Sequence, residues 1–350
     1  MENVDIKHYT VAQVRNWLEH NRVIEGLTSE VISPAYAWSL IHHPDVNDGD
    51  PIIATVFDNG TLAAAACAIP EIMVRPKFVD KDGKQKRVWW FPMLWVKPEY
   101  RGKGYGLVVI GSLAEVYGLD CAWTAWAVPE SIEIFEYLGC ATHYFMRYFM
   151  GEKQIKTSSF KGKLAKIKQD VHKWWHKNRM KALPHYDFEI KYITNIDDDS
   201  YDFICKHSTD YFILSSQKVI NWRLQYPGRI SMPLTVRVKK SGSFFSNISP
   251  LILNHHVQVW HKNELIGLYQ LRQGNASLSC ESIFYADEYR EYVFASVVEH
   301  IFRTQASHFE TESEELAEFV KKYVYFPRCT SERLSLSISP LIPVPERIVC

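Results

Sequence analysis

Alternating stretches of apolar and polar residues divide the first 150 residues of this chain into short helices and strands. Between two predicted strands stands Asp58-Asn59-Gly60, and an Asn-Gly pair between apolar runs is a strong signal for a two-residue hairpin turn. Strand 88–96 is aromatic and β-branched, and apolar residues at helical spacing follow from Leu107 to Tyr117. The predicted elements are helices 11–24 and 35–41, strands 52–57, 62–69, 72–78 and 88–96, helix 107–117, strand 121–127, helix 131–138 and strand 143–150.

A glycine-rich turn, residues 101–106, joins strand 88–96 to the helix that follows. Glycines at 102, 104 and 106 allow positive φ angles, so several backbone N–H groups can point at one object. These N–H groups also open a helix, whose N-terminus carries a partial positive charge. The turn therefore predicts an anion site, and a pyrophosphate is the simplest anion to fill it.

Two better-known phosphate loops fit this turn less well. A Walker loop needs Ser or Thr after Gly-Lys to bind magnesium, but Gly104 follows Lys103 here. A dinucleotide fingerprint needs a third glycine three positions after Gly106, where Val109 stands. What remains is Arg-x-x-Gly-x-Gly, directly after a strand that ends in Val-x-Pro-Glu-Tyr.

This combination of strand, loop and amphipathic helix resembles the acyl-CoA binding motif of the GNAT acyltransferase superfamily. The order of helices and strands up to residue 150 is also that of a GNAT domain. The resemblance implies acetyl-CoA or another short acyl-CoA as co-substrate, and no metal. The residues that it assigns to the cofactor are Leu94, Trp95, Val96, Arg101, Gly102, Lys103, Gly104, Tyr105, Gly106 and Phe135.

The second half of the chain repeats parts of the first. Residues 257–268 imitate the first hairpin, residues 283–290 imitate 94–101, and residues 222–227 echo the end of helix 35–41. No glycine follows Arg290, however, and Glu291 would repel a phosphate. We therefore expect a second GNAT-like domain that does not bind CoA.

The predicted fold class is mixed α and β, with two tandem GNAT-like domains that each hold a mixed central sheet flanked by helices. The first domain is expected to span 1–155 and the second 187–350, the latter serving acceptor binding or homodimer formation. Residues 156–186 are expected to form a basic helical connector. Between 156 and 182 the sequence has nine Lys or Arg residues and a single acidic residue, Asp170, while apolar residues recur at helical spacing. Packing of this helix on one domain is expected, with contact to phosphate or an anionic surface as the alternative.

Composition sets outer limits on the class of protein. The chain is 47% hydrophobic with a formal net charge of zero, so no bulk attraction to nucleic acid or membrane is expected. Its seven cysteines form no Cys-x-x-Cys pair, which is typical of reduced thiols. No stretch approaches the roughly 18 apolar residues of a membrane helix. We expect a cytoplasmic protein without a nucleic-acid partner and without membrane insertion.

N-Acyl transfer from a thioester needs an oxyanion donor, a proton acceptor for the amine and a leaving thiolate. Backbone N–H groups of residues 93–96 are the expected oxyanion donors, at a bulge that frees them from the sheet. In the family, the acid is commonly a tyrosine four residues before the glycine that ends the helix after the fifth strand. Phe135 stands at that place, with Tyr137 and Tyr144 nearby. A family asparagine at the start of that helix is replaced by Val128, so Glu130 and Ser131 are expected to do its work, and a thiolate can also leave without an acid.

The general base is predicted among side chains near the expected acceptor cleft. His42, His43, Glu130, Glu133 and His143 qualify, and each can equally be a structural or surface residue. His43 and Glu130 are favoured, since one precedes a proline in a loop and the other opens a helix. The resulting catalytic candidates are His43, Glu130, Tyr137 and His143.

Tandem chains of this size resemble bacterial acyltransferases that acylate the amine of a nucleotide-linked amino sugar for surface polysaccharides. The resemblance implies that acceptor class, with acetyl or a short hydroxyacyl group such as 3-hydroxybutanoyl as the donor. Aromatic rings of the protein would stack on the nucleobase of this acceptor, and an arginine would contact its diphosphate. The acceptor candidates are Trp38, His42, Trp222 and Arg223.

Two other functions compete with this interpretation. An aminoacyl-tRNA-dependent peptidyl transferase would share a tandem fold and a basic helix, but it would not need the pyrophosphate loop. A silent acyl-CoA-binding protein would share the loop, and Phe135 in place of the tyrosine favours it. Thiol release in the presence of an amine distinguishes the silent binder from the enzyme.

Overall fold

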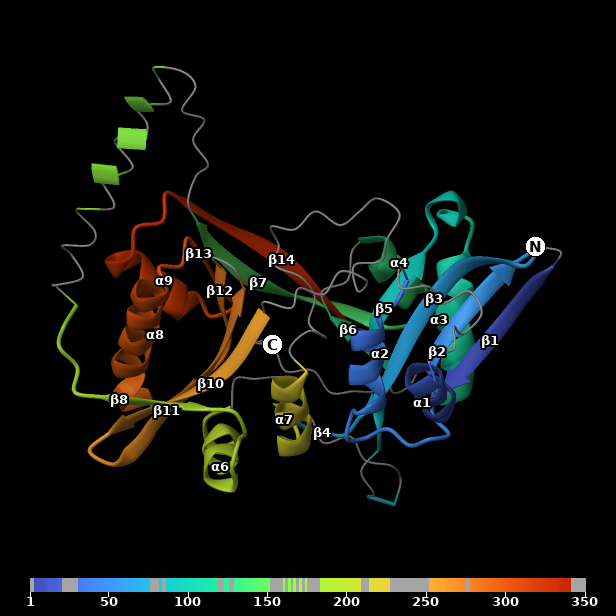
Figure 1. Ribbon diagram of the computed structural model, residues 1–350, viewed down its shortest axis with the longest axis horizontal. Helices are drawn as coiled ribbons and strands as arrows, with labels where there is room; N and C mark the ends of the chain where they lie inside the picture. The colour runs from blue at the N-terminus through green and yellow to red at the C-terminus, as the bar shows by residue number, and fades with distance from the viewer. Residues whose placement is uncertain are drawn as a thin grey trace. The chain divides into compact units, whose positions relative to one another are not determined.

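The computed structural model describes residues 3–20, 31–75, 82–83, 86–118, 122–125, 129–151, 160, 163–164, 166–167, 170–171, 174, 183–208, 214–226, 252–274 and 277–340. The chain forms two compact units (Figure 1). The first comprises Met1–Phe145, Tyr211–Pro250 and Leu334–Ile348, and the second comprises Met146–Asp210, Leu251–Arg333 and Val349–Cys350. Each unit holds a mixed set of paired strands flanked by helices, as predicted for tandem GNAT-like domains.

In the first unit the strands follow the order β1-β2-β3-β5-β6-β14-β7. Asn59 and Gly60 both have positive φ, at 49° and 76°, so the turn between β2 and β3 is the predicted Asn-Gly hairpin turn. Strands β5 and β6 run parallel, whereas the pairs β1–β2, β2–β3 and β3–β5 are antiparallel. The strands are β1 (Val4–Thr10), β2 (Pro51–Asp58), β3 (Thr61–Glu71), β5 (Val88–Val96), β6 (Ala122–Ala125), β7 (Ala141–Gly151) and β14 (Arg328–Ile338).

Both faces of this sheet are covered by helices. Helices α1 (Val11–His20) and α2 (Pro34–Ile41) pack on the face that carries Met93 and Trp95. Helix α3 (Tyr105–Tyr117) lies on the opposite face (Figure 1). Residues 63–66 of β3 are alanines with no exposed surface, and small side chains allow helices to approach a strand closely.

Strand pairing after residue 71 differs from the prediction of a hairpin between 72–78 and 88–96. Strand β3 continues to Glu71, which lies opposite Val88, so β3 itself is the partner of β5. Strand β4 (Met73–Arg75) instead pairs with β9 (Leu214–Ser215), from the second half of the chain. The long apolar run of β3 can accompany β5 to its start, which leaves β4 to another partner.

The second unit has the strand order β7-β13-β12-β11-β10-β8. Lys262 and Asn263 have φ angles of 48° and 65°, so the β10–β11 turn imitates the first hairpin without a glycine. The additional strands are β8 (Glu189–Ile193), β10 (Ile252–His261), β11 (Glu264–Gly274), β12 (Ser277–Tyr285) and β13 (His308–Thr311).

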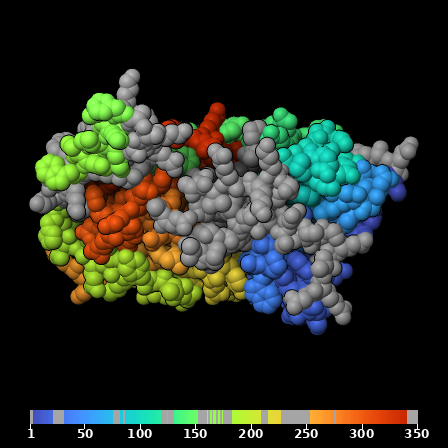
Figure 2. All heavy atoms as spheres, turned by 45° about the horizontal axis from the view of Figure 1, so that its top comes forward, coloured from blue at the N-terminus to red at the C-terminus, as the bar shows by residue number. Residues whose placement is uncertain are grey.

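Helices cover both faces of this second sheet as well. Helices α8 (Arg290–Thr304) and α9 (Glu314–Tyr323) bury their apolar sides in one core together with Val257 and Val259 of β10. Gln258 alternates with these valines and therefore faces the other side, where it bonds to Ser200 of helix α6 (Asp198–His207). In Figure 2, α8 and α9 lie at the surface in orange and red-orange.

The observed units do not follow the single boundary expected between 155 and 187. Residues 336–338 of β14 pair with β6, and helix α7 (Gln217–Gln225) packs on α2, so both belong to the first unit. Sheet pairing needs partners of matching register and not neighbours in sequence, and the chain crosses between the units within β7 and β14. Most of the expected connector 156–186 lies outside the described residues.

A buried polar network ties α8 to the second sheet. His300 is 2% exposed, with its Nε2 2.5 Å from the Tyr192 hydroxyl and its Nδ1 2.9 Å from the Tyr269 hydroxyl. Ser296 donates a hydrogen bond to the Tyr269 hydroxyl over 3.2 Å. Burial lowers the pKa of His300 to about 4, because the charged ring would lose its hydration.

This network predicts that the second unit loses stability in acid. In the unfolded chain His300 takes up its proton near pH 6.5, but in the folded unit only near pH 4, so the unfolded state binds more protons in between. Stability is therefore full above pH 6.5 and falls as the pH drops toward 4, by roughly 2 kcal/mol between pH 6.5 and 5. Urea unfolding at both pH values measures this loss. His300→Gln, which cannot titrate, should show a smaller loss, and an equal loss would contradict the assignment.

Candidate functional site

The glycine turn ends in a helix start that is open to an anion. Gly102 and Gly104 have φ angles of 73° and 84°, which L side chains rarely adopt. Gly104 is the N-cap of α3 and offers no side-chain hydrogen bond to the first helical turn. No described cap side chain therefore competes for the N–H groups that a phosphate would bind.

Gly106 serves packing, unlike the two glycines before it. A Cβ at this position would lie 2.9 Å from Cδ1 of Ile134 and 3.4 Å from Cγ2 of Val96. A larger residue here would require the end of the Ile134 side chain, on helix α4 (Pro129–Tyr137), to move, so glycine suits the close packing of α3. The start of α3 is thus held at the end of β5.

Positive charge surrounds this helix start. Arg101 turns back so that its Nε donates to the Val96 carbonyl over 3.2 Å, and Lys103 lies over the Tyr100 ring at 5.2 Å. Lys97 pairs with Glu99 at 2.8 Å. Arg101 and Lys103 are both exposed, so their charge is available to an anion at the turn.

Strand β5 leaves its parallel neighbour midway. Among the described residues, it pairs with β6 at Trp89 and Trp90 alone, whereas its antiparallel pairing with β3 continues to Val96. Alternate N–H groups of residues 93–96 point toward the side that β6 has left, because successive backbone groups of a strand face opposite edges. This edge can accept an extended ligand or donate to an oxyanion.

The bulge predicted within residues 93–96 of β5 lies earlier in the strand. The register between β3 and β5 shifts between Cys67 and Ile69, opposite Phe91 and Pro92, and not within residues 93–96. Pro92 has no N–H and cannot complete the ladder, which explains the irregularity there. Residues 93–96 are therefore regular toward β3, and none of them pairs with the described residues of β6.

Helix α4 carries the predicted catalytic residues Glu130 and Tyr137, and also Phe135, which stands at the place of the family's acid. Phe135 is 2% exposed and packs edge-on against Phe91 of β5 at 5.6 Å, which makes it part of the core between α4 and the sheet. Tyr137 is 77% exposed, and Glu130 is exposed in the first turn. His143 is half-buried on β7. Val128 lies outside the described residues.

His43 is a buried residue in this structure. Its ring is 3% exposed, contacts the Trp222 ring edge-on at 4.5 Å, and accepts the Asp45 backbone N–H at Nδ1 over 3.2 Å. A base for an incoming amine needs a reachable nitrogen. The geometry therefore favours packing over proton transfer for His43. Among the other predicted bases, His42, Glu130 and Glu133 are exposed and His143 is half-buried.

Three of the predicted acceptor residues, Trp38, His42 and Trp222, lie in one neighbourhood, although 180 residues separate His42 from Trp222 in sequence. Trp38 and His42 contact each other at 4.5 Å, and the His42 ring stacks on Tyr226 at 5.7 Å. Trp222 donates its indole N–H to the Ser39 carbonyl over 2.9 Å and is 3% exposed. Trp38, His42 and Tyr226, which we call the aromatic platform, are at least partly exposed, whereas Trp222 supports them from the core.

Trp222 and Arg223 belong to the first unit, which corrects their expected place in the second domain. Arg223 contacts Oε1 of Glu71 at 3.1 Å, and the Ser215 hydroxyl donates to the same oxygen over 2.5 Å. The Glu71 side chain is 1% exposed. This buried carboxylate ties the segment 214–226 to the end of β3.

Sequence reasoning missed Glu71 and its neighbour Asp45. Asp45 accepts the Ile72 backbone N–H over 2.8 Å, and burial raises its pKa. The available signal was one acid at the end of an apolar strand, 61–71, where a charge is costly unless it is paired. Its partner, Arg223, is too distant in sequence for any local pattern to reveal.

The corresponding helix start in the second unit is closed. Tyr186 donates to Glu291 over 2.8 Å, and the rings of Tyr186, Tyr289 and His261 all contact Tyr292. Aromatic side chains and an acid therefore occupy the first turn of α8, where the first unit has glycines. That the second unit does not bind CoA stays a prediction.

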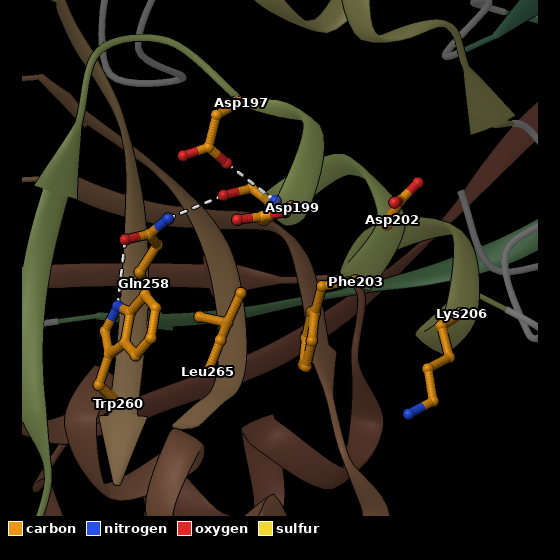
Figure 3. Close-up of a pocket in the computed structure, with 9 residues that line it drawn as sticks. Asp197, Asp199, Asp202, Phe203, Lys206, Gln258, Trp260 and Leu265 are labelled. Carbon is orange, nitrogen blue, oxygen red and sulfur yellow. Dashed lines mark hydrogen bonds between the residues drawn. The ribbon is translucent and has the colours of Figure 1, made fainter. Parts of the chain in front are cut away.

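The second unit holds a separate pocket of about 310 Å³ between α6 and strands β10 and β11 (Figure 3). Gln258 donates to Ser200 over 2.7 Å and accepts from the Trp260 indole over 3.1 Å, so its polar wall is already hydrogen-bonded. Three aspartates give the lining of this pocket a negative charge, whereas Arg101 and Lys103 make the glycine turn positive. The lining residues are Asp197, Asp199, Ser200, Asp202, Phe203, Lys206, Gln258, Trp260 and Leu265.

Among the described residues, no group of three or more His, Cys, Asp or Glu side chains is placed to hold a metal ion. The described part of the chain also has no helix long and apolar enough to cross a membrane.

Solved structures share this fold. A GCN5-related N-acetyltransferase from Anabaena variabilis superposes with a TM-score of 0.53 at 11% identity, over 97% of this chain and 74% of that one. A GCN5-related N-acetyltransferase from Kribbella flavida gives 0.51 at 12% identity, over 96% and 71%. A probable N-acyltransferase of unknown function from Enterococcus faecalis gives 0.51 at 12% identity, over 97% and 73%. The fold is therefore the GNAT acyltransferase fold.

Comparison of the amino-acid sequence with known families and proteins gives no match. No protein-family model matches the chain. No curated protein matches it significantly either.

The pairing of Glu71 with Arg223 generates a stability prediction. Arg223→Gln should cost about 3–5 kcal/mol, because it leaves the Glu71 carboxylate buried without a counter-charge. Glu71→Gln should cost less, since Arg223 is 25% exposed and can be hydrated. The double variant should cost less than the sum of the two, as measured by urea unfolding.

Arg290→Gln is the matched control. It breaks the exposed pair between Arg290 and Glu315, 3.4 Å apart, and should cost less than about 1 kcal/mol. Additive effects of the Glu71 and Arg223 substitutions would show that the two side chains are not coupled.

Proposed function

We propose that this chain is an acyl-CoA-dependent N-acyltransferase that acylates the amine of a nucleotide-linked amino sugar. The observation that carries the proposal is the glycine turn at the end of β5, next to a strand edge that β6 has left. The turn suits a pyrophosphate, and the edge suits the extended arm of a CoA thioester. Acetyl or a short hydroxyacyl group such as 3-hydroxybutanoyl is the proposed acyl group.

The acyl-CoA is proposed to bind the first unit alone. Backbone N–H groups of residues 102–106 and the charges of Arg101 and Lys103 would hold the pyrophosphate, while Leu94, Trp95 and Val96 would line the pantetheine arm. The contrast with the closed start of α8 supports this choice.

The reaction would proceed by direct attack. The neutral amine attacks the thioester carbonyl carbon, a C–N bond forms, and the carbonyl oxygen becomes an oxyanion that accepts from N–H groups on the free edge of β5. The C–S bond then breaks, and the amine proton passes to Glu130, to His143 or to water. The CoA thiolate needs no protein acid, because its pKa is low enough for it to leave as the anion.

The aromatic platform is the proposed place for the nucleotide base. Trp38 is 39% exposed, and Trp38, His42 and Tyr226 form a row of contacting rings, which is the kind of surface on which a planar base stacks. Arg223 lies one turn from Tyr226 on α7, and its guanidinium is suited to a diphosphate. The polysaccharide role of the product follows from this acceptor class and belongs to the same proposal.

The direct test of the cofactor site is Gly104→Glu. A side chain and a negative charge at the start of α3 should abolish CoA binding, which calorimetry measures, while circular dichroism stays unchanged. Gly104→Ala is the matched control, because it strains the same positive-φ position, where a Cβ meets nothing within 4 Å, without adding a charge. Two CoA sites per chain, or unchanged affinity in Gly104→Glu, would refute the proposed site.

The acceptor class is tested by thiol release in a screen of nucleotide-linked amino sugars against several acyl-CoAs. For an active pair, Trp38→Ala should raise the acceptor KM about tenfold and leave the acyl-CoA Kd unchanged, since stacking of one base contributes roughly 1–3 kcal/mol. Leu253→Ala, exposed to 57% on β10, serves as the control. CoA binding without thiol release for any amine would favour the silent binder.

A further inference from the structure

The pocket between helix α6 and strands β10 and β11 has no role in the proposed acyl transfer. All of its lining residues belong to the second unit. Its volume of about 310 Å³ lies at the lower end of the range of roughly 300–1,000 Å³ that is usual for sites of small organic molecules. The cavity is therefore large enough for a small organic ligand.

Apolar side chains form two walls of this pocket. Trp260 lies opposite Leu265 in the register between β10 and β11, so their side chains are neighbours on one face of the sheet. In the view of Figure 3, the Leu265 side chain lies between the rings of Trp260 and Phe203, the latter from α6. All three side chains are partly exposed. Such walls favour a ligand with an aromatic or aliphatic body, which they remove from water.

The buried polar side chains of the pocket are already hydrogen-bonded. Gln258 is 6% exposed and Ser200 has no exposed surface. The amide of Gln258 donates to Ser200 and accepts from the indole of Trp260 (Figure 3). Because these groups have partners, charge and shape are what remains to select a ligand.

The rim on α6 carries uncompensated negative charge. Asp199 and Asp202 stand three residues apart and are therefore neighbours on the helix surface, where like charges repel each other. Among the described residues, neither carboxylate has an ion-pair partner, although Lys206 follows Asp202 by four residues. Asp202 also lies beyond the first turn of α6, where the helix start no longer stabilises an acid. A cation at this rim would remove the repulsion.

Lys191 of β8 determines how a cationic ligand would be oriented. Its Nζ lies 4.3 Å from the centre of the Trp260 ring, which shows that this ring attracts an ammonium group. A second positive charge at the same ring would be repelled by Lys191. The positive end of a ligand therefore lies toward Asp199 and Asp202, and its apolar body lies toward Trp260.

We propose that this pocket binds an organic ammonium ion, which is a protonated amine with an aromatic or aliphatic body. The body packs against Trp260, Leu265 and Phe203. The ammonium group lies beside Asp199 and Asp202, which would repel phosphate-bearing molecules such as CoA. This binding site is separate from the proposed acyl-CoA site and does not rest on the proposed function.

The test uses the full chain with phenethylamine as the probe and phenethyl alcohol as its uncharged analogue. The two molecules share the same aromatic body, and calorimetry measures the affinity of each. We expect the amine to bind and the alcohol to bind more weakly by roughly fivefold or more, because only the amine is attracted to the aspartates. This difference should shrink in about 0.5 M salt, since salt screens exposed charges.

Variants of the charged rim should change the affinity in opposite directions. Asp199→Asn combined with Asp202→Asn should weaken amine binding roughly fivefold or more and leave the alcohol unchanged. Lys206→Gln should strengthen amine binding about twofold, because it removes a competing positive charge. Glu332→Gln is the matched control and should change neither affinity, since this acid is exposed on β14 and does not line the pocket.

A variant that fills the cavity tests where the amine binds. Leu265→Trp places a larger ring between the walls and should abolish amine binding. Leu253→Trp, at a site of β10 that is 57% exposed, is the control and should bind the amine normally. Urea unfolding of both variants checks that the second unit stays folded.

Three results would overturn the proposal. The first is that phenethylamine does not bind. The second is equal affinity for the amine and the alcohol, which would mean that the aspartates do not select a cation. The third is amine binding that persists in folded Leu265→Trp, which would place the amine elsewhere on the chain.

Discussion

The candidate acyl-CoA site depends on the close approach of α3 to β5. Gly106 suits this approach, because a Cβ there would lie 2.9 Å from the Cδ1 end of Ile134, which would have to move. The approach places the uncapped start of α3 at the end of the strand edge that β6 leaves after Trp90. Anion site and strand edge therefore form one continuous surface, which neither a glycine turn nor a splayed strand would provide alone.

The two units show what the same architecture becomes without this loop. In the second unit the glycine at the close contact lies on the strand and not on the helix. A Cβ on Gly267 of β11 would lie 2.2 Å from a methyl group of Val293 on α8. The helix start there is filled by Tyr186, Tyr292 and Glu291. Burial of apolar side chains stabilises the sheet and its covering helices in both units, with or without the glycines. Anion binding by a loop instead requires a few backbone conformations that only glycine adopts readily.

Charge in this protein is organised locally, and its total is uninformative. A sum of zero hides a basic segment at 156–182, an acidic pocket beside α6 and a buried carboxylate at Glu71. Each has a different physical consequence, because solvent screens exposed charges while buried ones must be paired. Glu71 thereby ties α7, through Arg223, to the end of β3.

Local sequence predicted most of the elements and the glycine turn, since hydrophobic periodicity, an Asn-Gly turn and glycine spacing act over a few residues. It also nominated Trp38, His42, Trp222 and Arg223 as acceptor candidates, but not that they share one unit. Tertiary structure alone decided that β4 pairs with β9, that the end of β14 enters the first sheet, and that Arg223 neutralises Glu71. These are contacts between residues more than 100 positions apart, and no local pattern encodes which distant strand or counter-charge will complete a sheet edge or a buried acid.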